Sequence, residues 1–239
     1  MIIMAKIEPW LMKRPAAIHA VDTYLKDGMT VGLGTGNAAK MAIDRIVQYV
    51  SEGYDLRFVS TSLDTDMYVR EKGLSLTDIN DVDLIDVTFD GADEVSPDLI
   101  LIKGLGGALL KEKIVAELTD REIIIVDDFK NVDVLGIKTP LPVEVCKYGH
   151  KRTADRLSEL GCEPSLRMKD EQPFVTDEGH LIYDCKFPSI RGPKDLLKKI
   201  ESISGVVTCG LFIDMVHAVV SYCEDGTVRE SLKGNQNTY

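Results

Sequence analysis

The sequence predicts an α/β protein: a Rossmann-like, mostly parallel sheet domain that carries a smaller, inserted α+β domain of ferredoxin-like topology. Three observations lead to this prediction. Strand-like and helix-like segments alternate through the first part of the chain, two glycine clusters each precede a predicted helix, and the order of elements changes after Gly136. Alternating strands and helices are typical of a mostly parallel sheet.

The elements before Gly136 follow from local patterns. Apolar residues at helical spacing between residues 10 and 26 predict a helix that ends at Asp27-Gly28, because glycine favours a helix C-terminus. Short apolar runs then predict buried strands, and the stretches between them predict helices. The predicted strands are 29–36, 56–62, 83–91 and 121–128, and the predicted helices are 37–50, 63–73 and 108–119.

After Gly136 the extended segments carry prolines and turn residues. PLPVEV (140–145) predicts an edge strand, because prolines suit an edge. The segment 174–187 predicts a hairpin that turns at Asp177-Glu178-Gly179.

Two more helices and a last strand give the order strand–helix–strand–strand–helix–strand, which is that of a split βαβ module. We therefore expect the small domain at 136–209 and the Rossmann-like domain at 1–135 plus 210–239. The remaining predicted elements are helices at about 149–160 and from about Pro193, and a strand at 206–212.

Composition narrows the class of protein. With 28 basic and 39 acidic side chains, the 239-residue chain has a net charge of −11, which disfavours nucleic-acid binding because that requires Lys and Arg to neutralise phosphates. No apolar run approaches the roughly 20 residues of a membrane span, and the first residues lack the apolar core of a signal peptide. The five cysteines form no CxxC pair and are not spaced with histidine as in a zinc site. We expect a cytoplasmic protein with no metal, no cofactor, no nucleic-acid partner and no membrane contact.

The first glycine cluster, Gly32-Leu33-Gly34-Thr35-Gly36, joins a predicted strand to a predicted helix that Asn37 is expected to cap. Small residues let backbone N–H groups approach a ligand, and a helix N-terminus favours an anion. Residue 37 is not glycine, so the dinucleotide fingerprint is broken and a dehydrogenase is disfavoured. The alternative is a tight turn without a ligand.

Two acids stand where a predicted strand leaves the sheet. Asp90 ends the strand and Asp93 follows three residues later, in the sequence DGADEV. Ligands bind at the carboxyl ends of strands in open α/β sheets, and carboxylates there can align sugar hydroxyls or move protons. The alternative is an ordinary acidic turn.

Glu112 is the most informative residue of the third cluster, which begins Lys103-Gly104-Leu105-Gly106-Gly107 and continues into a predicted helix. Its neighbours three and four positions away are alanines, leucine and valine. Such surroundings raise the pKa of a carboxyl group and suit a general base, although the helix N-terminus opposes this effect. The alternative is a surface glutamate flanked by Lys111 and Lys113, both of which we expect to point outward.

A lysine after the strand 121–128, Lys130, is a further candidate that can reach a phosphate. The alternative is an ordinary surface lysine.

Taken together, these segments resemble ribose-5-phosphate isomerase of the A type. The resemblance covers nearly the whole chain, in the order VGLGTGNA, DVTFDGADEV, IKGLGGALLKEKIVA, VDDFKNVDVLG, PLPVEV and GVVTCGLF. It implies a metal-independent aldose–ketose isomerase that interconverts ribose 5-phosphate and ribulose 5-phosphate. It also implies a homodimer or homotetramer whose partner is a small sugar phosphate.

The resemblance assigns roles to individual positions. Glu112 falls on the family's general base, and Asp90, Asp93 and Lys103 fall on its active-site acids and lysine. The substrate-binding positions that it implies are Thr35, Gly36, Asn37, Ala38, Asp90, Gly91, Ala92, Asp93, Lys103, Gly104, Leu105, Gly106 and Lys130.

Two positions depart from the family pattern. Asn37 stands where the family often has serine, and its amide can still donate to a phosphate oxygen. Leu105 stands where bacterial members have glycine, and we expect an ordinary backbone conformation there because leucine is strained at positive φ.

The isomerisation requires a base that takes the C2 proton of the sugar and returns a proton to C1 through an enediolate. Asp90 and Asp93 are both candidates for assisting the opening of the sugar ring, and the sequence does not choose between them. The competing functions are a related sugar-phosphate deaminase or lactonase and a non-catalytic sugar-phosphate sensor.

Overall fold

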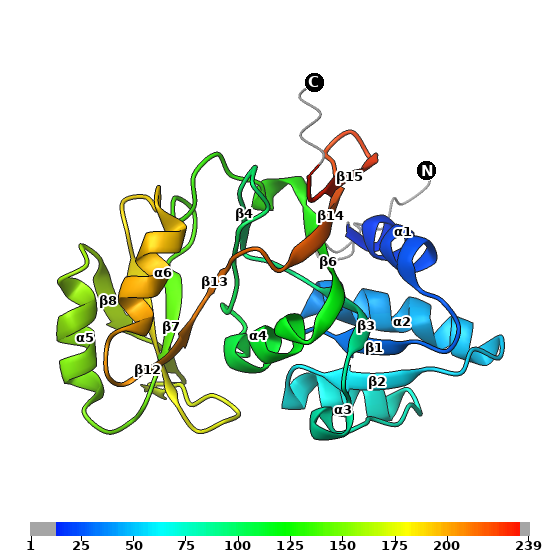
Figure 1. Ribbon diagram of the computed structural model, residues 1–239, viewed down its shortest axis with the longest axis horizontal. Helices are drawn as coiled ribbons and strands as arrows, with labels where there is room; N and C mark the ends of the chain where they lie inside the picture. Colours follow the sequence, from blue (N-terminus) through cyan, green and yellow to red (C-terminus); the bar gives the residue numbers. More distant parts are fainter. Residues whose placement is uncertain (1–12, 235–239) are drawn as a thin grey trace, which may run out of the picture.

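The main sheet, on the right in Figure 1, has six strands in the order β15-β14-β6-β3-β1-β2. The computed structural model describes residues 13–234, and within them every pairing of this sheet is parallel except β14 with β15. The prediction of a mostly parallel, Rossmann-like sheet is confirmed. Its strands are β1 Thr30–Leu33, β2 Arg57–Ser60, β3 Ile85–Asp90, β6 Thr119–Asp127, β14 Val216–Tyr222 and β15 Val228–Leu232.

Helices cover both faces of this sheet, and the sequence of β6 shows why. Successive side chains of a strand point to opposite faces, so Ile123 and Ile125 pack under α1 and α2 while Ile124 and Val126 pack on the side of α4. Both faces are buried, which explains the unbroken apolar run. The helical elements of this region are α1 Arg14–Tyr24, α2 Asn37–Ser51, α3 Leu63–Glu71, η2 Ile79–Asp81, α4 Leu109–Glu117 and η3 Asp128–Lys130.

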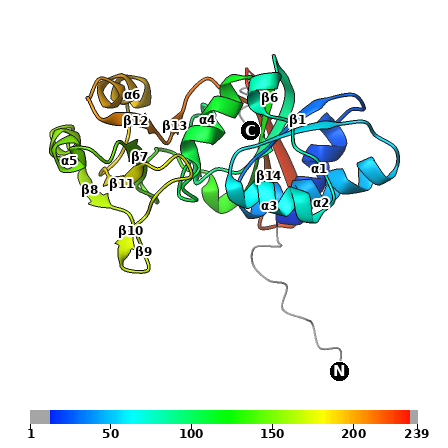
Figure 2. The same cartoon turned by 90° about the horizontal axis from the view of Figure 1, so that it is seen from below.

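A second, antiparallel sheet has the order β12-β7-β11-β8, and α5 and α6 pack on it (Figure 2). The chain order β7-α5-β8-β11-α6-β12 is that of a ferredoxin-like module, as predicted. The domain boundaries at 136 and 209 stay a prediction. The elements are β7 Leu141–Val145, α5 His150–Ser158, β8 Glu163–Leu166, β11 Leu181–Lys186, α6 Pro193–Glu201 and β12 Val206–Cys209.

The prediction that 140–145 is an edge strand is wrong, because β7 pairs with both β11 and β12. Pro142 is tolerated inside the sheet for a local reason. Its C=O accepts a hydrogen bond from the N–H of Gly210. The paired residues of β7 and β12 run from Val145 to Val143, so the ladder stops at the residue next to Pro142. The missing N–H of Pro142 therefore falls where the ladder stops.

The second strand of this module was also placed wrongly. The turn of the predicted hairpin exists, since the N–H of Gly179 donates to the C=O of Thr176, but Val175 forms only an isolated bridge with Leu181. The second strand of the module is instead β8, which pairs with the other edge of β11 and whose sequence EPSL carries no apolar run. A short hairpin of β9 (Met168–Lys169) and β10 (Gln172–Pro173), visible in Figure 2, follows β8.

The predicted strand 206–212 divides at Gly210 between two sheets. Its second part, β13 (Leu211–Phe212), pairs with β5 (Leu101–Ile102), which pairs with β4 (Glu94–Val95). This three-stranded sheet places the segment after Ile102 next to the end of β12, because the N–H of Lys103 donates to the C=O of Gly210 at 2.9 Å.

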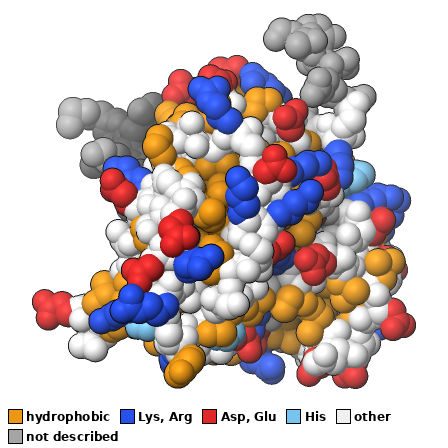
Figure 3. Space-filling model, turned by 60° about the vertical axis from the view of Figure 1, so that its left-hand side comes forward, with side chains coloured by type: hydrophobic (Ala, Val, Ile, Leu, Met, Phe, Trp, Pro, Cys, Tyr) orange, Lys and Arg blue, Asp and Glu red, His pale blue; other side chains and the backbone are white. Residues whose placement is uncertain are grey.

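Within residues 13–234, no helix is both long and apolar enough to cross a membrane. On the face drawn in Figure 3, acidic and basic side chains are interspersed.

Candidate active site

A cavity of about 210 Å³ lies where β1 and β3 end and α4 begins. This is the carboxyl edge of the parallel sheet, where open α/β folds bind ligands. Every residue predicted for the site lines this cavity except Asp90 and Leu105. The lining residues are Lys13, Thr35, Gly36, Asn37, Ala38, Gly91, Ala92, Asp93, Lys103, Gly104, Gly106, Glu112 and Lys130.

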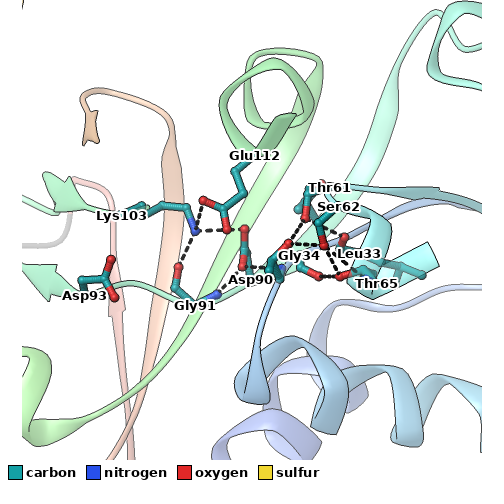
Figure 4. A network of polar contacts seen from close by, with 12 residues as sticks. Leu33, Gly34, Thr61, Ser62, Thr65, Asp90, Gly91, Asp93, Lys103 and Glu112 are labelled. Atoms are coloured by element: carbon teal, nitrogen blue, oxygen red, sulfur yellow. Dashed lines mark hydrogen bonds and ion pairs between the residues drawn. The ribbon is translucent and has the colours of Figure 1, made fainter. Parts of the chain in front are cut away.

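Lys103 lies at the centre of the buried charges (Figure 4). Its Nζ is 2.9 Å from Asp90 Oδ2 and 3.6 Å from Glu112 Oε2, and it donates to the C=O of Gly91 at 2.6 Å. Burial by itself lowers the pKa of this lysine, but the charges of Asp90 and Glu112 outweigh burial and raise it. Lys103 is therefore a fixed positive charge.

Asp90 acts as an anchor below the cavity. Its Oδ1 accepts the N–H groups of Thr35, at 3.1 Å, and of Gly91, at 2.7 Å, while Oδ2 faces Lys103. The carboxylate lies so close to Gly34 that a Cβ there would be 2.2 Å from it, so glycine is required. With both oxygens engaged and 1% of its surface exposed, Asp90 orients the loop and the lysine.

The loop after β1 is held by hydroxyl groups and leaves a helix N-terminus open to the cavity. Thr35 Oγ1 lies 2.8 Å from both Thr61 Oγ1 and Ser62 Oγ, so the loop is fixed to the segment after β2. The prediction that Asn37 caps the helix is wrong: the cap residue is Gly36, no side chain caps α2, and Asn37 is its first residue. The uncapped N–H groups and the helix dipole make this end suited to an anion.

Glu112 lies in the first turn of α4 and is 6% exposed. Its Oε2 is buried and has no hydrogen-bond partner within residues 13–234. Burial raises the pKa of Glu112 to about 8, against the opposing charge of Lys103. A carboxyl group poised near neutral pH and left partly unpaired is equipped to exchange a proton.

Asp93 is the acid that faces the cavity. Its Oδ2 accepts the N–H of Leu105 at 2.9 Å. Burial raises the pKa of Asp93, and the Leu105 N–H, Lys103 and Lys130 partly offset that rise.

Two lysines lie where the sequence did not predict them. Lys13, directly before α1, lines the cavity and lies 3.3 Å from Asp127, yet no motif surrounds it in the sequence. Lys113 was expected to point outward and is buried instead, because its Nζ donates to the C=O groups of Cys209 and Leu211. Lys111 does lie near the surface, beside Glu178.

Sequence reasoning also missed Glu122. As the first inward residue of β6 on the α4 side, it is buried next to the charged cluster. One of its oxygens has no hydrogen-bond partner in the described part of the chain. Burial and the charge of Asp90 raise the pKa of Glu122 well above the ordinary value, against the opposing charge of Lys103.

A larger cavity, of about 890 Å³, lies between α3, η2 and α4. It contains Arg70, Lys111 and His180, but the open helix N-terminus, Lys103 and Glu112 do not line it. The smaller cavity is therefore the candidate active site.

Comparison with known proteins identifies the family of this chain. The family model for ribose 5-phosphate isomerase A (phosphoriboisomerase A) matches residues 57–226. A protein of Bacillus mycoides named ribose-5-phosphate isomerase A is 45% identical over 204 residues, which is 85% of this chain and 92% of that protein. This chain belongs to the ribose 5-phosphate isomerase A family.

Solved structures of isomerases share the whole fold. Ribose 5-phosphate isomerase from Plasmodium falciparum superposes with a TM-score of 0.91 at 33% identity, covering 94% of this chain and 99% of that one. A D-ribose-5-phosphate isomerase in complex with phospho-erythronic acid gives 0.88 at 35% identity, over 92% and 97% of the two chains. The deaminase, lactonase and sensor alternatives are not favoured by these relatives.

The departure of Leu105 from the isomerase A pattern is accommodated as expected. Leu105 has a negative φ, whereas the neighbouring Gly104 has φ +104°. The loop therefore needs glycine at 104 and accepts leucine at 105.

Proposed function

We propose that this chain interconverts ribose 5-phosphate and ribulose 5-phosphate through an enediolate, with Glu112 as the group that moves the proton. The observation that carries the proposal is the Glu112 carboxyl group. It is buried and lacks a hydrogen bond on Oε2, and it lines the same cavity as an uncapped helix N-terminus. A base at one end and an anion site at the other match a phosphorylated sugar.

The phosphate end is formed by α2 together with two lysines. The N-terminal N–H groups of α2 bind phosphate oxygens, and Lys13 and Lys130 add positive charge at the same cavity. This arrangement explains how a chain with a net charge of −11 holds an anionic substrate.

Glu112 then takes the C2 proton of the open-chain aldose. The electrons of that C–H bond form the C1=C2 double bond, and negative charge develops on O1. Lys103 and the N–H of Gly106, in the loop that follows it, stabilise this charge. The hydroxyl proton of O2 passes to O1, so that the negative charge moves to O2. As the C2=O bond forms, the electrons of the C1=C2 bond take the proton back from Glu112 at C1, which completes the ketose and restores the Glu112 carboxylate.

Ring opening is assigned to Asp93. Asp90 does not line the cavity and has both oxygens bonded, whereas Asp93 faces the cavity and has a raised pKa. Asp93 supplies a proton to the ring oxygen as its bond to C1 breaks. The C1 hydroxyl gives its proton to the resulting Asp93 carboxylate as the carbonyl forms, which restores the acid.

The test is a coupled assay of ketopentose phosphate formed from ribose 5-phosphate. We expect Glu112→Gln to lower kcat by about 100-fold or more, because it removes the proton-transferring group, while substrate still binds by calorimetry. Glu117→Gln, at an exposed position of the same helix, is the matched control and should retain full activity. No turnover by folded wild-type protein refutes the proposed function, and an active Glu112→Gln variant removes Glu112 from its role.

A homodimer or homotetramer and a cytoplasmic location are further proposals from the family resemblance. Sedimentation equilibrium tests the first, since a monomer at micromolar concentration would contradict it.

A further inference from the structure

An arginine–carboxylate pair ties the four-stranded sheet to the glycine loop of the active site. Arg167 directly follows β8, and its guanidinium faces Asp184 of β11: Nε donates to Oδ2 at 2.9 Å and Nη2 donates to Oδ1. The remaining nitrogen, Nη1, donates to the C=O of Gly104 at 2.8 Å and to the C=O of Leu105 at 3.1 Å. The Arg167 side chain is 12% exposed, so one fixed side chain holds two consecutive peptide groups.

The direction of these carbonyls determines where the N–H groups point. In a planar trans peptide the N–H points away from the C=O. The N–H of Leu105, in the first peptide, accordingly donates to Asp93 on the far side from Arg167. The N–H of Gly106, in the second peptide, has no partner among the described residues, and Gly106 lines the cavity. Successive N–H groups on one side of the chain form an anion-binding concavity.

Phe174 supports the same loop from outside. Its N–H donates to the C=O of Arg167 at 2.9 Å, and its ring covers Gly107 so closely that a Cβ there would lie 2.4 Å from a ring carbon. The Arg167 guanidinium also lies 5.9 Å from the centre of this ring. Both supports come from the segment between β8 and β11.

We propose that Arg167 is a positioning residue for the isomerase reaction: by holding the carbonyls of Gly104 and Leu105, it keeps the Gly106 N–H aimed at the enediolate oxygen. The inference rests on the proposed function. Arg167 does not line the cavity, so it acts through the loop. Without Arg167, the Gly104 C=O still accepts the N–H of Gly107 at 3.0 Å, but the Leu105 C=O loses its hydrogen bond. The peptide between Leu105 and Gly106 can then rotate, and a carbonyl that faces the cavity repels the developing negative charge.

The first test is the kinetics of Arg167→Met, which preserves the apolar stem and removes the donors. We expect kcat to fall about 10- to 100-fold, somewhat less than the loss of a direct oxyanion donor, while KM changes by less than about 3-fold. Arg167→Lys, which keeps one donor, should recover part of kcat. Arg152→Met is the matched control, because Arg152 is 89% exposed. Unchanged kcat with only a lower melting temperature overturns the inference.

The second test measures binding without turnover. Phospho-erythronic acid has a carboxylate where the enediolate has its oxygens. Inorganic phosphate can occupy only the phosphate end of the cavity, at the N-terminus of α2. Calorimetry should show that Arg167→Met weakens the binding of phospho-erythronic acid about 10-fold and leaves the affinity for inorganic phosphate unchanged. Equal effects on both ligands, or on neither, overturn the inference.

A third variant keeps the test decisive if Arg167→Met does not fold. Asp184→Asn retains the shape but loosens the guanidinium, and the same selective loss is expected; normal kcat and normal binding overturn the inference. If the wild type binds phospho-erythronic acid but does not isomerise ribose 5-phosphate, the proposed function fails, while the binding comparison still decides the role of Arg167 in the loop.

Discussion

Replacing Lys103 by methionine should destabilise the protein more than any single surface change, because it leaves buried acid without its counter-charge. Lys103 is 2% exposed and holds Asp90 Oδ2 at 2.9 Å, and it also binds the C=O of Gly91. Asp90 Oδ2 is the nearer of the two carboxylate oxygens, at 2.9 Å from Lys103 Nζ against 3.6 Å for Glu112 Oε2, so Asp90 is the partner that loses most. Removing one partner of a buried ion pair costs about 3–5 kcal/mol.

The assay is urea unfolding of Lys103→Met at pH 7, with Lys111→Met as the control. Lys111 pairs with Glu178 near the surface, so its loss should cost under about 1 kcal/mol. The double variant Lys103→Met/Asp90→Asn should regain part of the lost free energy, because it removes the unpaired charge. A loss below about 1 kcal/mol for Lys103→Met, or no recovery in the double variant, would refute the view that Asp90 and Lys103 form the buried charge balance.

Three other outcomes follow from the same cluster. The kcat/KM for ribose 5-phosphate should rise with pH through an apparent pKa near 8, because Glu112 acts only when deprotonated; a profile that is flat between about pH 6 and 9 contradicts this. Glu122→Gln should gain stability relative to wild type as pH rises: the folded-state pKa of Glu122 lies above its unfolded value, so the stability from its protonated form is present at low pH and lost as pH rises. Urea unfolding at pH 5 and pH 9 checks this, and an equal difference at both contradicts it. Asp93→Asn should lower the turnover of cyclic ribose 5-phosphate about 100-fold yet preserve solvent exchange of the C1 proton of ribulose 5-phosphate. Ribulose 5-phosphate cannot close a ring, because its C5 oxygen is phosphorylated. Equal loss of both rates would exclude a ring-opening role.

The sequence predicted four strands of the main sheet, β1, β2, β3 and β6, because they carry local signals, whereas β14 and β15 were not predicted as strands. β6 is buried on both faces, so its apolar run is unbroken. β1 leads into a glycine-rich loop, and β3 ends at Asp90, directly before the DGADEV turn. The second strand of the small sheet, β8, was missed because its exposed and half-buried residues carry no such run. Its position is decided by pairing with β11, which is a long-range contact.

Site residues with local signals were likewise predicted, and those placed by long-range contacts were missed. Glu112 was found because its helix neighbours are apolar. Glu122 was missed because, read along the chain, it is one more charged residue at the start of a strand, and only the packing of α4 over β6 buries it. The misplacement of Lys113 has a similar origin, since its partners lie near the end of the chain, in the segment that joins β12 to β13.

The burial of Lys113 explains how a short helix can place a base accurately. The segment from Lys103 to Lys113 is bound to the break between β12 and β13 at both ends: the N–H of Lys103 donates to Gly210, and Nζ of Lys113 donates to Cys209 and Leu211. Between these ends, Arg167 fixes the glycine loop. A nine-residue helix such as α4 is marginal by itself in water. The position of Glu112 relative to Lys103 is therefore set by the strand that leaves the small sheet, which makes that sheet part of the catalytic geometry.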